Sequence, residues 1–130
     1  MPEVRRTALV MFSAEQMYQL VNDVSRYPEF LPGCVATEVH EESDVHMLAQ
    51  LTLKKGPVKQ VFSTSNTLTP NREIAMELAN GPFEYLRGAW TFQPLSEQAC
   101  KISFELNFEF SSKMVGAAFN KMFSDLTLTQ

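Results

Sequence analysis

The sequence has few of the features by which proteins commonly reveal their chemistry. Its 130 residues include only two cysteines, two histidines and five glycines. The longest unbroken apolar run, residues 8–12, is far shorter than the roughly 20 residues that cross a bilayer. The same run is too short for the apolar region of a secretory signal. We therefore expect neither a transmembrane segment nor a secretory leader, and a cytoplasmic protein in a reducing environment.

The cysteines and histidines do not form a metal or nucleophile motif. Cys34 and Cys100 are far apart and show no C-x-x-C or Cys/His ligand spacing, so we expect two buried, reduced thiols and no metal. His40 and His46 are expected to be solvated surface residues. A thiolate pair between Cys34 and His46 is conceivable, but no spacing favours it.

Other catalytic patterns are also missing. The glycines fit neither G-x-G-x-x-G nor a P-loop, and the chain contains no G-x-S-x-G or H-E-x-x-H motif. Glu105 and Glu109 share one face of a predicted strand but lie about 13 Å apart at 3.3 Å per residue, too far for paired acid–base work. The sequence thus offers no catalytic residue and requires no cofactor.

The charge balance is acidic except at one place. Fifteen acidic and eleven basic residues leave a net charge of −4, which disfavours general binding to DNA or to an anionic membrane. Lys54, Lys55 and Lys59 nevertheless crowd a predicted turn at Gly56-Pro57. This cluster is either a solvated hairpin tip or a docking point for RNA phosphate. Arg5 and Arg6 extend it only if the first strand borders that hairpin.

Helical and strand periodicities divide the chain into segments. Residues 4–12 are rich in apolar and β-branched residues and predict a strand. Ser13 and Gln16 form a capping box that starts a helix. Two prolines and a glycine in residues 27–33 predict a short helical turn that ends in a loop. From there to about residue 110 the hydrophobic period is two, which is typical of strands.

The strands and the last helix complete the predicted fold. Val45, Met47, Ala49, Leu51 and Leu53 alternate with the polar residues His46, Gln50, Thr52 and Lys54, which are expected on the solvated side. Residues 86–92 and 100–110 alternate in the same way. Gly88 within one strand indicates a bend or a close approach. After residue 112 the apolar positions follow a helical period. We predict one α+β domain over residues 1–130, with an antiparallel sheet of about seven strands covered by the last helix.

Large apolar side chains are abundant on the predicted inner positions. Ten phenylalanines, seven methionines and one tryptophan fall largely on the inward side of the strands and on the last helix. They either fill an ordinary core or line an apolar ligand cavity, to which Thr64 and Asn66 would add hydrogen-bonding groups. The candidate cavity residues are Phe30, Phe62, Thr64, Asn66, Met76, Phe83, Leu86, Trp90, Phe92, Phe104, Phe108, Phe119, Met122 and Phe123.

Several motifs resemble those of the bacterial ribosome association toxin (RatA) family, which is allied to the coenzyme-Q-binding proteins of the START-like superfamily. The resemblance covers residues 6–126. It is carried by SAEQMY at 13–18, VND at 21–23, YPEFLPGC at 27–34, NGPF at 80–83, L-x-G-x-W-x-F-x-x-L at 86–95 and FEF at 108–110.

The resemblance implies a helix-grip fold, in which a curved sheet wraps a long C-terminal helix and a short helical pair follows the first strand. It also implies a non-enzymatic protein that binds the large (50S) ribosomal subunit and blocks subunit joining. Related proteins bind ubiquinone in the cavity and support respiration, so a quinone or lipid chaperone without a ribosomal role is one alternative. A cyclase- or dehydratase-like enzyme is another. Family members carry the last helix further, so we expect a shortened helix here.

Overall fold

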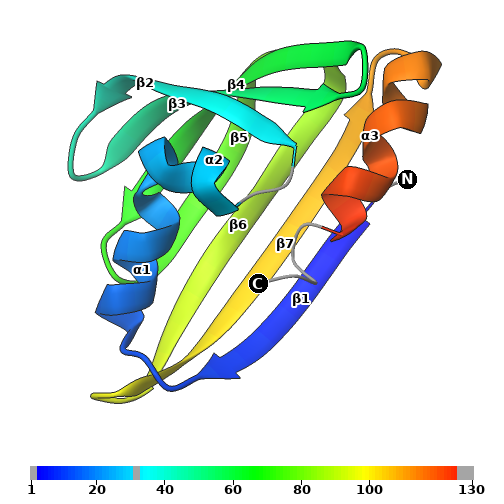
Figure 1. The fold of residues 1–130 in the computed structure, drawn as a ribbon. Coiled ribbons are helices and arrows are strands. Elements are labelled where there is room, and N and C mark those ends of the chain that lie inside the picture. The colour runs from blue at the N-terminus through cyan, green and yellow to red at the C-terminus, as the bar shows by residue number, and fades with distance from the viewer. Residues whose placement is uncertain (1–2, 31–32, 126–130) are drawn as a thin grey trace.

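The computed structural model describes residues 3–30 and 33–125, and it has an α+β fold. Seven antiparallel strands form one curved sheet in the order β1-β7-β6-β5-β4-β3-β2 (Figure 1). The first strand therefore pairs with the last one, and every other neighbouring pair is consecutive in the chain. This confirms the predicted α+β class and the run of antiparallel strands.

The strands and helices have the following bounds in the described residues. The strands are β1 (Glu3–Val10), β2 (Cys34–Glu42), β3 (His46–Lys55), β4 (Val58–Thr69), β5 (Glu73–Asn80), β6 (Phe83–Ser96) and β7 (Ala99–Phe110). The helices are α1 (Ala14–Asn22), the 3-10 turn η1 (Val24–Arg26), α2 (Tyr27–Phe30) and α3 (Lys113–Asp125).

The start of α1 is set by local hydrogen bonds. The Gln16 amide donates to Ser13 Oγ at 3.1 Å, and the Ser13 amide donates to Gln16 Oε1 at 2.9 Å. This capping box was predicted, and it satisfies two amides that the first helical turn leaves without partners. The preceding strand ends earlier than expected, because Met11 and Phe12 lie beyond Val10 and are exposed.

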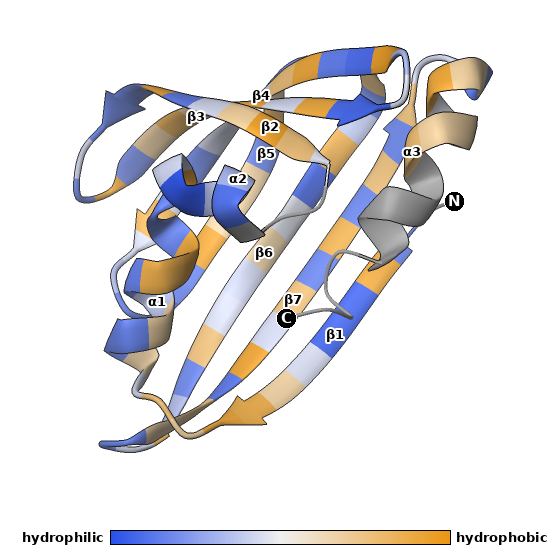
Figure 2. Cartoon of the chain, in the orientation of Figure 1, coloured by the Kyte–Doolittle hydropathy of each residue, from blue (hydrophilic) through white to orange (hydrophobic). Residues whose placement is uncertain are grey.

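The alternation along the strands separates the two faces of the sheet. In β7 every even-numbered residue from Cys100 to Phe110 is buried, and Figure 2 shows the resulting bands of hydrophobic and hydrophilic residues. Two expectations for β3 were wrong. Val45 was expected to face inward, but it precedes the strand and is exposed, and Thr52 was expected on the solvated side but is buried. A register shift in β2 beside Thr52 breaks the simple alternation there.

All described helices lie on the concave face of the sheet (Figure 1). Helix α1 contacts β6 and β7, where Tyr18 meets Phe92, and α3 contacts β7 and β1, where Phe119 meets Phe110. The convex face carries no helix among the described residues. The sheet thus has one covered face and one open face.

Candidate functional site

The predicted cavity residues line the concave face, and most of them are packed. Nine are buried: Phe62, Thr64, Asn66, Phe83, Leu86, Phe92, Phe104, Phe108 and Phe119. Met76 and Trp90 are only half-buried. The side chains of Phe30, Met122 and Phe123 lie outside the described residues.

One hydrophobic cluster fills the end of the concave face beneath α3. Phe83 stacks on Phe110 with ring centroids 4.4 Å apart and meets Phe62 edge to face at 5.3 Å. Phe110 in turn lies 6.1 Å from Phe119 of α3. Such aromatic contacts add specificity to the burial of large apolar surfaces. The described part of α3 is therefore held by aromatic packing against β7.

A second cluster fills the opposite end, beneath α1. Tyr18 meets Phe92 edge to face, with centroids 5.8 Å apart, and Met47 and Cys100 are almost completely buried beside them. The sequence prediction missed Tyr18 as a concave-face residue. Its spacing of four residues from Ala14 on one helical face was the available signal.

The two clusters meet at a seam in the middle of the concave face. Four half-buried side chains pack against both clusters: Tyr27, Leu51, Met76 and Trp90. The Trp90 ring lies 4.4 Å from the Phe104 ring. These large apolar side chains are therefore partly accessible in the middle of the concave face.

Asn66 is the unusual residue of this seam. It is 5% exposed, faces the concave side from the middle of β4, and is paired in register with Met47 and Met76. Its buried Oδ1 has no hydrogen-bond partner. A buried polar atom without a partner costs about 1–3 kcal/mol, so native proteins rarely retain one. Thr64, also buried, lies two residues away on the same face.

The other polar groups of the concave side are kept neutral by burial. Burial raises the pKa of the Cys34 and Cys100 thiols, so neither is a thiolate at neutral pH. Burial, together with Cys34 and Asp23, also raises the pKa of Tyr27, whose hydroxyl donates to the Val21 carbonyl oxygen. Both cysteines are free and buried, as predicted.

The three lysines of the predicted cluster lie at the exposed turn between β3 and β4. Lys54 and Lys59 are direct partners across the strands, and Lys55 precedes Gly56 at the tip. None of the three forms an ion pair within the described part of the chain. Figure 1 shows this hairpin at the end of the sheet where α3 begins. Like charges placed directly opposite each other destabilise a strand pair.

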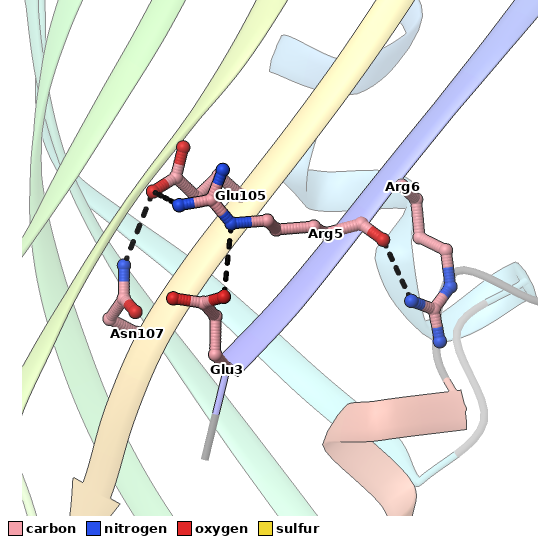
Figure 3. Close-up of polar contacts among 5 residues, drawn as sticks. All are labelled: Glu3, Arg5, Arg6, Glu105 and Asn107. Atoms are coloured by element: carbon pink, nitrogen blue, oxygen red, sulfur yellow. Dashed lines mark hydrogen bonds and ion pairs between the residues drawn. The ribbon is translucent and has the colours of Figure 1, made fainter. Parts of the chain in front are cut away.

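The two arginines of β1 do not extend this lysine cluster. β1 pairs with β7, and three other strands separate β7 from β3. Arg5 bonds Glu3 and reaches across to Glu105 on the convex side, whereas Arg6 lies on the side of β1 that faces α3 (Figure 3). The condition for a joint basic surface, that the first strand borders the hairpin, is therefore not met.

The remaining polar residues of interest lie on the surface. His40 is exposed, and His46 is half-buried, with Nε2 2.8 Å from Ser65 Oγ. Glu105 and Glu109 are exposed, as predicted. Over residues 3–30 and 33–125, no cluster of three His, Cys, Asp or Glu side chains is arranged to hold a metal ion. No helix in the same ranges is long and apolar enough to span a membrane.

Known proteins share both the sequence and the fold. A family model described as polyketide cyclase / dehydrase and lipid transport matches residues 10–130. The ribosome association toxin RatA of Vibrio cholerae is 57% identical over 127 residues, which cover 98% of this chain and 88% of that protein. The Escherichia coli K12 protein of the same name is 49% identical, with coverages of 97% and 80%.

More distant relatives extend the comparison. The mitochondrial coenzyme Q-binding protein COQ10 of Drosophila melanogaster is 31% identical over 94% of this chain and 52% of its own length. The Zhui aromatase/cyclase from Streptomyces has a TM-score of 0.78 at 18% identity, covering 98% of this chain and 90% of that one. A START superfamily protein from Mycobacterium smegmatis has a TM-score of 0.75 at 21% identity, with coverages of 97% and 88%. These two structures are similar in fold.

The family model matches most of this chain, and the two bacterial toxins align with nearly all of this chain. The motifs that suggested the resemblance lie on the elements that build the concave face: the α1 cap, the η1–α2 segment, the turn before β6 and the strands β6 and β7. The chain therefore belongs to the polyketide cyclase / dehydrase and lipid transport family and, within it, to the ribosome association toxin family.

Proposed function

We propose that this protein associates with the large ribosomal subunit and blocks its joining with the small subunit, and that it does so without catalysing a reaction. The observation that carries the proposal is the 57% identity to a ribosome association toxin over 98% of this chain. The lysine hairpin supplies a surface suited to such an association.

A partner that carries phosphates would reduce the repulsion between the lysines of the hairpin. The cross-strand pair of Lys54 and Lys59 brings two cations together, and neither forms an ion pair with a carboxylate within residues 3–30 and 33–125. RNA phosphates supply that offset, and their counterions are released when the lysines take their place. The rest of the chain is acidic, so the hairpin is the basic feature that would orient the protein on RNA.

Sucrose-gradient profiles of cells that overproduce the protein test the association. We expect the native chain to raise the ratio of free subunits to joined ribosomes. The double variant K54E/K59E should not do so, because it reverses the charge of the hairpin. The matched control R72E/K101E changes the net charge equally on exposed or half-buried residues away from the hairpin, and it should act like the native chain. An unchanged ratio with the native chain contradicts the proposal.

The polar side chains of the concave face favour binding over catalysis. Apart from the half-buried Arg6, the described polar side chains of the concave face are chiefly hydroxyls, one amide and thiols of raised pKa, and none of these is a strong acid or base at neutral pH. A cyclase- or dehydratase-like activity would need such a group beside the substrate.

A second function is favoured by Asn66: the seam holds a small apolar ligand such as ubiquinone or another lipid. The half-buried Trp90 and Met76 would contact its apolar body, and Asn66 Oδ1, which has no partner, would accept a hydrogen bond from a hydroxyl of the ligand, such as a quinol or a lipid carries. The similarity to a coenzyme Q-binding protein at 31% identity is consistent with a quinone.

Native mass spectrometry and solvent extraction of the protein from its own host test this second function. We expect a co-purifying quinone or lipid in the native chain and much less of it in N66L. N66L removes the Oδ1 acceptor that has no partner, and it should fold because an apolar side chain suits the surrounding core. The control T67V changes the next residue of β4, which faces the other side, and should retain the ligand. Equal ligand content in N66L and the native chain would contradict the role of Asn66.

A further inference from the structure

The convex face of the sheet carries a hollow that has no counterpart in the predicted site. Its volume is about 410 Å³, within the range of small-molecule sites. Its lining residues belong to β4, β5, β6 and β7, and its side chains alternate with those that face the helices, so it lies on the side of the sheet that Figure 1 shows without a described helix. It is lined by Ser65, Thr67, Ala75, Met76, Glu77, Arg87, Gly88, Ala89, Glu105 and Asn107.

The floor of the hollow is made of small side chains in register. Thr67 pairs with Ala75, and Ala75 pairs with Ala89, so three neighbouring strands present short groups side by side. At Gly88, whose missing side chain would point to the concave side, only the backbone borders the hollow, and an added Cβ would collide with the Glu105 carbonyl oxygen and with Leu106. The result is a flat, weakly apolar floor on a face where long side chains are usual.

Charged and amide groups stand around this floor. Glu105 Oε1 accepts from Arg5 at 3.3 Å and from Asn107 at 3.5 Å, and these bonds hold the carboxylate in place (Figure 3). Glu77 and Arg87 are 3.8 Å apart and both largely exposed, so their pairing is weak and both can turn toward a ligand. The hollow therefore offers hydrogen-bond donors and acceptors at the edge of a flat floor.

This combination matches the chemistry of a nucleobase. A base has a flat ring that can lie on the floor, and its edges carry both donors and acceptors. The carboxylates of Glu77 and Glu105 disfavour a phosphate in the hollow itself. Lys59 lies on the same face of β4, six residues from Ser65 and thus about 20 Å away at 3.3 Å per residue. Phosphates of neighbouring nucleotides can lie there while the base enters the hollow.

We propose that the convex hollow receives an unstacked nucleobase of ribosomal RNA, with guanine favoured. Guanine presents N–H donors that a glutamate can accept and the O6 and N7 acceptors that Arg87 or Asn107 can reach. The ribosomal source of the base rests on the proposed function, whereas the base site itself rests on the geometry of the hollow.

Amide chemical shifts in NMR spectra of the full chain test the base site, with guanosine 5′-monophosphate and cytidine 5′-monophosphate as the probes. We expect the guanosine nucleotide to shift the amides of Thr67, Ala75 and Ala89, and the cytidine nucleotide to bind about tenfold more weakly. A89L should abolish the shifts because leucine fills the hollow. The control T91L lies two residues further along the same face of β6 and should keep them.

The other outcomes separate the two proposals. Unchanged binding in A89L, or no response to either nucleotide, overturns the base site even if the protein still co-sediments with large subunits. A response to arginine amide instead of the nucleotides overturns it in favour of a basic protein partner. Guanosine binding without any ribosomal co-sedimentation overturns the ribosomal source and the proposed function, but not the base site. E77Q should weaken nucleotide binding without changing the fold, because Glu77 is largely exposed.

Discussion

The two faces of this sheet share one backbone and differ in almost everything else. Along β7, Phe108 points to the concave side and is fully buried, whereas its neighbours Asn107 and Glu109 point to the convex side. The concave face carries the aromatic clusters that hold the helices. The convex face carries small and charged side chains around an open hollow. The comparison indicates that stability depends mainly on one face, while the other is free to serve recognition.

Truncating the concave core should have the largest effect. Phe108→Ala removes a ring that contacts both Phe83 and Phe110 edge to face, and we expect it to lower the free energy of unfolding by about 3–5 kcal/mol. Glu109→Ala, on the next residue but the other face, should change it by no more than about 0.5 kcal/mol. Urea denaturation measures both. Similar losses for the two variants would break the comparison between the faces.

A substitution at Gly88 should lower the free energy of unfolding by an intermediate amount, because the backbones of β6 and β7 are close together there. A methyl group there would collide with the Glu105 carbonyl oxygen and with Leu106, so we expect Gly88→Ala to cost about 2–3 kcal/mol. Gly56→Ala is the control. Its φ is +58° but nothing lies near the added atom, and the cost should be about 1 kcal/mol, from the backbone conformation alone. If the two variants are equally stable in urea, steric closeness is not what requires Gly88.

The smallest effect on stability is expected from substituting Arg5, which lies beside the hollow on the convex face. Arg5 is fully exposed, and its ion pairs with Glu3 and Glu105 are screened by water and salt. Arg5→Ala should leave the thermal midpoint nearly unchanged at high salt. It should nevertheless loosen the Glu105 carboxylate and weaken binding in the hollow. A large loss of stability that persists at high salt would contradict this division of roles.

Much of the fold could be predicted from local pattern. The capping box at Ser13, the alternation in β7 and the turn at Gly56-Pro57 all depend on residues close together in the chain, and each was confirmed. The failures occurred where the alternation was broken by neighbours in space. Thr52 is buried beside an irregular stretch of β2, and a single strand's pattern contains no information about such a partner.

The candidate site was predictable only in part. Alternation placed Asn66 and Trp90 on the inward face, but it could not show that Asn66 lacks a hydrogen-bond partner or that Trp90 lies at the seam of two clusters. The convex hollow could not be anticipated at all. It requires Thr67, Ala75 and Ala89 to lie side by side, and that depends on the register of three strands.

The sequence by itself determined the element types, the faces of most strands and the family, because these follow from residue spacing and from motifs that are local in the chain. Only the tertiary structure decided which strands are neighbours. The pairing of β1 with β7 separates Arg5 from the lysine hairpin and brings it to Glu105, a residue 100 positions away. Side chains that recognise a partner act together in space, and their proximity is set by strand register and sheet curvature, which depend on the packing of the whole chain.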